Sequence, residues 1–311
     1  MPGRSIVSTT RTTALPSFFS RSRTPSGRKD ATINFSAQTN SRHSSNNKSS
    51  MNYGSHSLLK SLQNINIALK EASLGSSVSK ATVYRYSSFY SFNEDQALKA
   101  ICQAYHQRYL HLTMTGDLLA QFQTRTLFPL TGLKTRDLKC NVLYMRPCRF
   151  VPEEMKTSNV IDNLCYVLND LSQTKEECLN GVAFIANLED WTMKNYSHDY
   201  CIQFMEALQG KMVPTKVELF LIVNPPRWFG RIWKVMKPML SKSFSKKVHI
   251  IKEQRLGDFF MEGYEQYLPM EFESCGWRQT EEIVEDYIDM KQYENEQKLT
   301  KRSKFSSDCI I

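Results

Sequence analysis

The sequence predicts an α/β fold: a mostly parallel, mixed sheet covered by helices, behind a long amino-terminal tail. Three observations lead to this prediction. Short apolar runs such as VAFIANL (182–188) and VELFLIV (217–223) alternate with stretches of helical periodicity. Continuously apolar strands separated by helices are typical of parallel sheets with both faces covered. A chain of 311 residues is long enough for one such domain and a tail.

Residues 1–80 predict a disordered, basic, Ser/Thr-rich tail. They carry eleven Lys or Arg and two acidic residues, an excess equal to the formal charge of +9 on the whole chain. Such a composition buries too little apolar surface to offset the entropy of ordering. Within this range, 58–72 could form a short amphipathic helix. Plain disorder, an organelle transit peptide and a phosphorylatable segment remain open as interpretations of the tail.

Order is expected to begin near Phe92. Residues 92–133 predict a shortened helical lobe, in which Asn93 caps one helix and a second helix spans about 116–126. Pro129 and Gly132 mark a loop that ends this lobe.

Strands and helices alternate from residue 134 to 278, which we take as the main domain. The predicted strands are 142–145, 182–188, 217–223 and 248–252, and the helices between them are about 153–171, 197–208 and 227–240. After the fourth strand the chain turns acidic. It predicts a short helix at 257–267, an extended exit at 268–272, and then a charged carboxy-terminal helix and tail at 279–311.

The chain lacks the sequence motifs of the common α/β enzymes. It contains no G-x-G-x-x-G, no P-loop and no G-x-S-x-G. The eight cysteines form no C-x-x-C pair and no His lies at ligand spacing, so we predict no metal, no cofactor and no catalytic residue.

Charge and hydropathy restrict the partners. Residues 81–311 have no net charge and show no nucleic-acid-reading module, so nucleic acid is not an expected partner. No apolar run approaches the roughly 20 residues needed to span a bilayer. We therefore expect a monomeric cytoplasmic protein with free thiols that associates with membranes only peripherally. Organelle targeting by the tail stays open.

The segment 216–252 is the most informative part of the chain. Its apolar strand ends at Asn224-Pro225-Pro226, and aromatic and aliphatic residues then recur at helical spacing. From Pro225 through Lys252 there are eight Lys or Arg and no Asp or Glu. A basic, apolar helix between two strands is a poor catalytic centre, but it suits a lid over a site that meets membranes.

The order of these motifs resembles the CRAL-TRIO lipid-binding family over residues 94–277. This family includes tocopherol- and retinal-binding proteins and a yeast phosphatidylinositol/phosphatidylcholine transfer protein. The stretch GVAFIANLEDWT is similar to the family's central strand and turn, with Asn187 and Asp190 in place of the family's Asp and Gly. LPMEFESCGW is similar to its exit segment. Four residues fall on its gate signature, namely Asn224, Pro226, Lys237 and Pro238.

The resemblance implies an apolar pocket closed by a mobile gate helix. One alternating set of strand residues would form the floor, either Phe184 with Ala186 or Val182 with Ile185, together with Phe220 and Ile222. The gate stripe would form the wall: Trp228, Phe229, Ile232, Trp233, Met236, Met239 and Leu240. Without the family signature, the same stripe would be interpreted as ordinary core.

Five polar residues align with positions that contact a lipid headgroup in relatives: Thr192, Thr215, Lys216, Lys246 and Lys247. Thr215 stands where inositol-binding relatives carry an acid, which weakens the case for phosphatidylinositol. Solvated surface lysines are the alternative interpretation.

The function that follows is non-enzymatic binding of a hydrophobic lipid, phospholipid or isoprenoid-like, and its transfer between membranes or presentation. The expected partners are the lipid and an anionic membrane surface. A membrane adaptor that uses lipid as an address, and an enzyme with an unrecognised site, are the alternatives.

Overall fold

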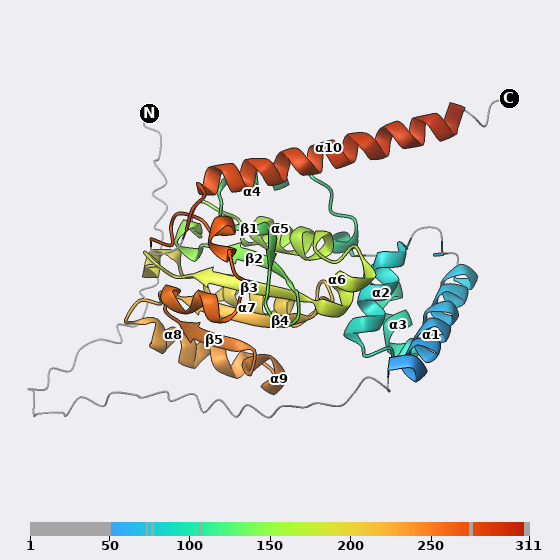
Figure 1. The fold of residues 1–311 in the computed structure, drawn as a ribbon, viewed down its shortest axis with the longest axis horizontal. Helices are drawn as coiled ribbons and strands as arrows, with labels where there is room; N and C mark the ends of the chain where they lie inside the picture. The colour runs from blue at the N-terminus through green and yellow to red at the C-terminus, as the bar shows by residue number, and fades with distance from the viewer. Residues whose placement is uncertain (1–50, 73, 76–77, 106, 274–275, 308–311) are drawn as a thin grey trace, which may run out of the picture. The chain divides into compact units, whose positions relative to one another are not determined.

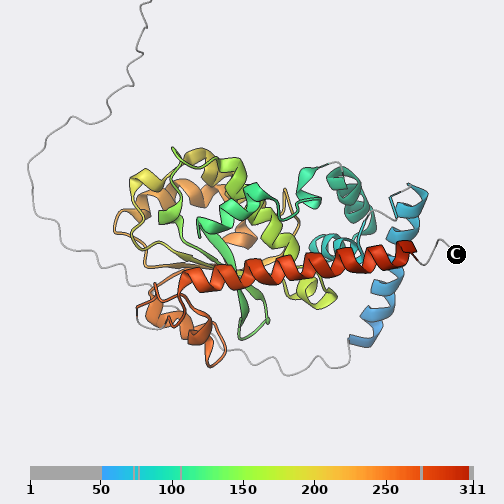
Figure 2. The same ribbon diagram turned by 90° about the horizontal axis from the view of Figure 1, so that it is seen from above.

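The computed structural model describes residues 51–72, 74–75, 78–105, 107–273 and 276–307 (Figures 1 and 2). Its centre is a five-stranded sheet with the strands in sequence order. β1 (Leu127–Lys134) runs antiparallel to β2 (Asn141–Met145). β3 (Val182–Asn187), β4 (Val217–Val223) and β5 (Val248–Ile251) continue the sheet in parallel with β2. The predicted class, a mixed and mostly parallel α/β sheet covered by helices, is confirmed.

The apolar runs become strands because both faces of the sheet are covered. Every residue of β3 is buried, and β4 is buried from Phe220 to its end. A polar side chain at these positions would lose its hydration without gaining a partner, so the runs carry almost only hydrophobic residues.

β1 is the strand that the sequence analysis missed, because Pro129 and Gly132 indicated a loop. Pro129 pairs with Leu143 and has no amide hydrogen to donate. An edge strand tolerates this, because its outer side has no neighbouring strand that needs the hydrogen bond. The pairing register shifts between Pro129 and Lys134, and Gly132 has a φ of +92° within this irregular stretch. The sheet therefore begins inside the range assigned to the helical lobe.

Helices connect and cover the strands. They are α4 (Gly116–Gln123), α5 (Thr157–Asp170), α6 (Lys175–Asn180), α7 (His198–Leu208), α8 (Phe229–Met236), α9 (Lys242–Ser245) and α10 (Thr280–Ser307). Short 3-10 turns are η1 (Arg108–Leu110), η2 (Pro147–Arg149), η3 (Met193–Asn195), η4 (Lys237–Met239), η5 (Glu253–Asp258) and η6 (Tyr264–Tyr267). α5 packs on β1, α4 and α7, and α10 packs on β1 and α4, so these helices enclose one edge of the sheet (Figure 2).

The predicted helix at 227–240 is shorter in the structure and is followed by two further turns. Pro238 has no amide hydrogen and cannot continue an α-helix, and the chain passes through η4 before α9 begins. The short helix expected at 257–267 is instead a pair of 3-10 turns separated by Gly263, whose φ is +78°.

The folded part begins earlier than the predicted tail allowed. α1 (Met51–Glu71), α2 (Lys80–Phe89) and α3 (Glu94–Tyr105) pack around a second apolar cluster, which includes Leu62, Ile65 and Leu69 of the proposed amphipathic helix. These three residues recur at three and four, so α1 has one apolar face to bury. The helical lobe therefore includes residues that we had assigned to a disordered tail, and residues 1–50 lie outside the described part.

Candidate functional site

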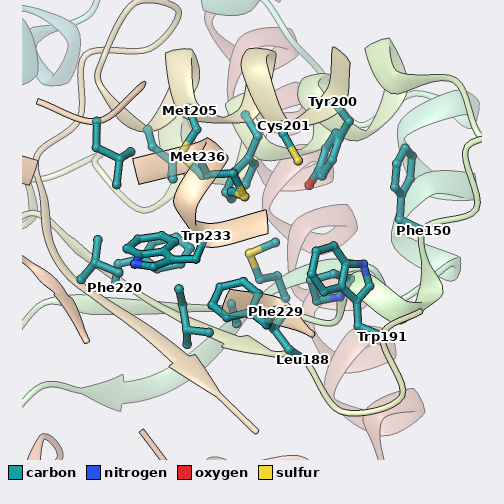
Figure 3. Close-up of a pocket in the computed structure, with 18 of the residues that line it drawn as sticks. Phe150, Leu188, Trp191, Tyr200, Cys201, Met205, Phe220, Phe229, Trp233 and Met236 are labelled. Carbon is teal, nitrogen blue, oxygen red and sulfur yellow. The ribbon is translucent and has the colours of Figure 1, made fainter. Parts of the chain in front are cut away.

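An apolar cavity of about 70 Å³ lies between the sheet, α7 and the segment from α8 to α9 (Figure 3). Its lining contains no Lys, Arg, Asp, Glu or His. The lining residues are Met145, Pro147, Phe150, Ala186, Leu188, Trp191, Asn195, Tyr200, Cys201, Phe204, Met205, Leu208, Phe220, Ile222, Phe229, Trp233, Met236, Leu240, Phe244 and Val248.

The floor comes from the faces of β3 and β4 that point toward α7. Ala186 and Ile222 are register partners and both line the cavity, as does Phe220. Phe184 lies one step behind them, where its ring stacks on Phe220 at a centroid distance of 5.3 Å. Of the two floor sets that the sequence left open, only Ala186 lines the cavity, whereas Phe184, Val182 and Ile185 do not.

The gate stripe divides into residues that face the cavity and residues that support them. Phe229, Trp233 and Met236 line the cavity at the four- and three-residue spacing of one face of α8, and Leu240 lines it from the position after η4. The other three lie beside them. Trp228 packs on Trp191 with ring centroids 4.8 Å apart, Ile232 packs against the core, and the Met239 carbonyl accepts a hydrogen bond from Gln209 Nε2.

Sequence reasoning missed the wall opposite the gate, which α7 provides. Tyr200, Phe204 and Leu208 follow one another at i, i+4 and i+8, and Cys201 and Met205 form the adjacent row. This periodicity was visible in the sequence, but an apolar helix face does not itself distinguish a cavity wall from solid core. Burial raises the pKa of Cys201 to about 11 and the pKa of Tyr200 well above its usual value, so both are neutral near pH 7.

Hydrogen bonds fix the loop between β3 and α7. Asn195 Nδ2 donates to the carbonyls of Cys148 and Phe150, and Asn195 Oδ1 accepts from the amide and hydroxyl of Thr192. Asp190 has a φ of +57°, a backbone region that favours glycine, and it occupies the position where the resemblance expects glycine. The loop thus retains a left-handed residue without the glycine.

A charged cluster at the carboxyl ends of β2 and β3 lies beside the cavity but does not enter it. Arg146 contacts Glu271 at 3.0 Å and Asp190 at 3.3 Å, and Arg149 contacts Glu271 at 2.6 Å. Tyr144 donates its hydroxyl to the same Glu271 at 2.8 Å. These pairs hold the exit segment 268–272 against the sheet, so we assign them a structural role.

The structure does not bring the five predicted headgroup residues together. Thr192 follows the carboxyl end of β3, whereas Thr215, Lys216 and Lys247 lie at the amino ends of β4 and β5. Lys247 Nζ contacts Glu218 at 2.8 Å and the Val217 carbonyl at 2.9 Å.

The others are also poorly placed for a headgroup. Thr215 is buried, burial lowers the pKa of Lys216, and Lys246 is exposed. None of the five lines the cavity.

Two further findings concern the described residues only. They contain no group of three His, Cys, Asp or Glu placed to hold a metal ion. Among them, no helix combines the length and apolar character that crossing a membrane requires.

Comparison with known proteins adds to this geometry. Residues 130–273 match the family described as CRAL/TRIO domain. That segment is a CRAL/TRIO domain. It contains the whole cavity lining, from Met145 to Val248, and the segment between β4 and β5 in which the sequence predicts a gate. The family that the sequence resembles is thereby confirmed for residues 130–273.

Individual relatives match a smaller part of the chain. The alpha-tocopherol transfer protein-like proteins of Mus musculus and Homo sapiens are 26% and 24% identical over 110 residues. Each alignment covers 35% of this chain and 32% of the relative, so the chain spans about a third of the relatives it matches. Among solved structures, the crystal structure of Sfh5 aligns with 70% of this chain and 81% of its own, at 13% identity and a TM-score of 0.46.

Proposed function

We propose that the domain takes a hydrophobic lipid from a membrane, encloses it in the apolar cavity and releases or presents it elsewhere. The observation that carries this proposal is a cavity with no charged lining, closed on one side by a basic amphipathic segment. Sites for lipid-like ligands combine an apolar lining with few polar groups. The names of the mouse and human relatives, which include tocopherol transfer, support a neutral lipid as cargo.

The gate has to move for a lipid to enter. Pockets that hold drug-sized ligands have volumes of about 300 to 1,000 Å³, whereas the cavity here is about 70 Å³. Phe229, Trp233 and Met236 fill much of the remaining space between the sheet and α7 (Figure 3). Displacement of α8 would therefore create the volume and expose these side chains to the membrane at the same time.

The outer surface of the gate suits an anionic membrane. Arg227, Arg231, Lys234 and Lys237 are exposed, and none forms an ion pair with the described part of the chain. Exposed basic residues beside apolar ones are typical of helices that lie in a membrane interface. A transient, peripheral association of a monomer from the cytoplasm is part of the proposal.

The arrangement favours a neutral lipid over a phospholipid. The lysine best placed for a phosphate, Lys247, is already paired with Glu218 and lies outside the cavity lining. A membrane adaptor that retains its lipid, or an enzyme, would differ from a transfer protein in whether bound lipid leaves unchanged.

The test has two parts. Lipid that co-purifies with the full chain is identified by mass spectrometry, and transfer of that lipid between donor and acceptor vesicles is then followed with time. Phe229→Asp/Trp233→Asp should abolish transfer, because two carboxylates on the inner gate face oppose both closure and membrane insertion. Leu59→Asp/Ile67→Asp, on the exposed face of α1, makes the same chemical change away from the cavity and should transfer normally.

Both double variants must retain the wild-type circular dichroism spectrum and unfold cooperatively. Transfer at the wild-type rate in the gate variant would refute the gate. Tight lipid binding without transfer would favour the adaptor, and a chemically altered lipid would favour an enzyme.

A further inference from the structure

Two polar groups in the cavity wall have no partner in the structure. The indole Nε1 of Trp191 and the hydroxyl of Tyr200 are buried and make no hydrogen bond. Both residues line the cavity and are only 7% exposed. Figure 3 shows the Tyr200 ring extending from α7 with its oxygen toward the interior of the cavity. Buried donors without acceptors are uncommon in folded proteins and call for an explanation.

The neighbouring groups do not supply the missing acceptors. The Asn195 amide also lines the cavity, but its oxygen accepts from the amide of Thr192 and its nitrogen donates to the carbonyls of Cys148 and Phe150. The contacts around the two rings are aromatic: Tyr200 packs on Phe150 at 4.5 Å and on Phe204 at 5.6 Å, and Trp191 packs on Trp228. Packing therefore fixes the rings while their polar atoms stay available.

We propose that Trp191 and Tyr200 receive an oxygen atom of the bound lipid, and that this lipid is neutral, such as a long-chain alcohol, aldehyde or ketone. An indole can only donate, and a phenol can donate as well, so the ligand must supply an acceptor. The lining offers no cation, so an ionised carboxylate or phosphate would be buried without compensation. This inference rests on the proposed function and narrows its cargo.

The position of the two donors also gives the lipid a direction. Trp191 and Tyr200 lie after the carboxyl end of β3, with Pro147 and Phe150 nearby in the lining. Phe244 and Val248, near the start of β5, line the cavity beside the amino-terminal part of the parallel strands. The oxygen would therefore lie at the Trp191 end, and the hydrocarbon would extend over Phe220 toward Phe244.

The experiment compares two probes that differ in one oxygen: phytol, a branched C20 alcohol, and its parent hydrocarbon phytane. Each is presented to the purified full chain from phosphatidylcholine vesicles, and the bound amount is measured by mass spectrometry. Tyr200→Phe and Trp191→Phe keep an aromatic ring and remove the donor. Each should lower phytol binding roughly three- to tenfold, the value of one neutral hydrogen bond, and should leave phytane binding unchanged.

Phytane binding also reports whether the variant pocket is intact. In addition, ligand-free Tyr200→Phe should melt at or above the wild-type temperature, because the substitution removes an unsatisfied buried hydroxyl. The matching carboxylic acid should bind more weakly than phytol at neutral pH and gain affinity as the pH falls toward its own pKa.

Phytol binding at the wild-type level in both variants would overturn the inference, as would a wild-type protein that accepts only phospholipid. In either case lipid binding by the pocket would still stand. If the wild-type protein binds neither probe and no phospholipid, the proposed function itself fails.

Discussion

Neutralising the outer cations of the gate should weaken docking to anionic membranes by about two orders of magnitude. Arg231, Lys234 and Lys237 are exposed and have no carboxylate partner in the described structure, so their full charge is available to a membrane. Each basic residue near an anionic surface contributes about 1 kcal/mol. Replacing all three with Gln therefore removes about 3 kcal/mol, which is roughly a hundredfold in affinity. Salt screening makes this an upper limit.

The assay is sedimentation of the protein with vesicles of phosphatidylcholine, with and without phosphatidylserine, at low and high salt. The control variant replaces Lys60, Lys99 and Lys175 with Gln, which removes the same charge from exposed positions on α1, α3 and α6. The basic residues of 1–50 are identical in all proteins and contribute equally. Equal losses in the gate variant and the control would show that net charge acts, and not the gate.

Three further predictions follow from the contacts. Cys201 lies in the closed cavity, and burial raises its pKa to about 11, so its labelling by a thiol-reactive bimane reagent should be slow. Anionic vesicles should accelerate this labelling, and Cys201→Ser gives the background from the other cysteines. An unchanged rate would contradict gate opening. Asp170 and Lys291 form a mostly buried ion pair at 2.7 Å, so Asp170→Ala should lower the free energy of unfolding in urea by about 3 kcal/mol. Glu206 pairs with Lys211 at the surface, so Glu206→Ala should lower it by less than about 1 kcal/mol. Burial raises the pKa of Tyr86 to about 12, so the stability that its neutral phenol contributes is present below pH 10 and is lost as the pH rises toward 12. Between these two pH values the free energy of unfolding of Tyr86→Phe should therefore fall by about 2 to 3 kcal/mol less than that of the wild type. Equal losses in the two proteins would refute the assignment.

The strands that are completely buried could be predicted from the sequence. The strand that contains turn-forming residues could not. The continuous apolar runs of β3 and β4 predicted both strands to within one residue, because covered strands admit few polar side chains. β1 was missed because Pro129 and Gly132 are turn residues by composition, and only the pairing with β2 shows that an edge position tolerates them.

The pocket was predictable on its gate side and not on its α7 side. The spacing of Phe229, Trp233 and Met236 identified one apolar face, and the chemistry around it, basic and free of acids, pointed to a membrane. The face that contains Tyr200 has the same periodicity as any core helix. Only the structure shows that the hydroxyl of Tyr200 is buried without a hydrogen-bond partner, and this distinguishes the α7 face from an ordinary core face.

The two ends of the proposed gate differ in their contacts with the rest of the domain. Gln209 directly follows α7, and its side chain makes two hydrogen bonds to the carboxyl end of the gate. Its Nε2 donates to the Met239 carbonyl, and its Oε1 accepts from the Ser241 amide. Toward its amino end, side-chain contacts with the wall are aromatic packing, such as Phe229 on Trp191, which is non-directional and can be exchanged for contact with lipid. We therefore expect α8 to swing away from the sheet while residues 239–241 stay fixed to α7. Gln209→Ala would loosen this fixed end and should raise the Cys201 labelling rate even without vesicles.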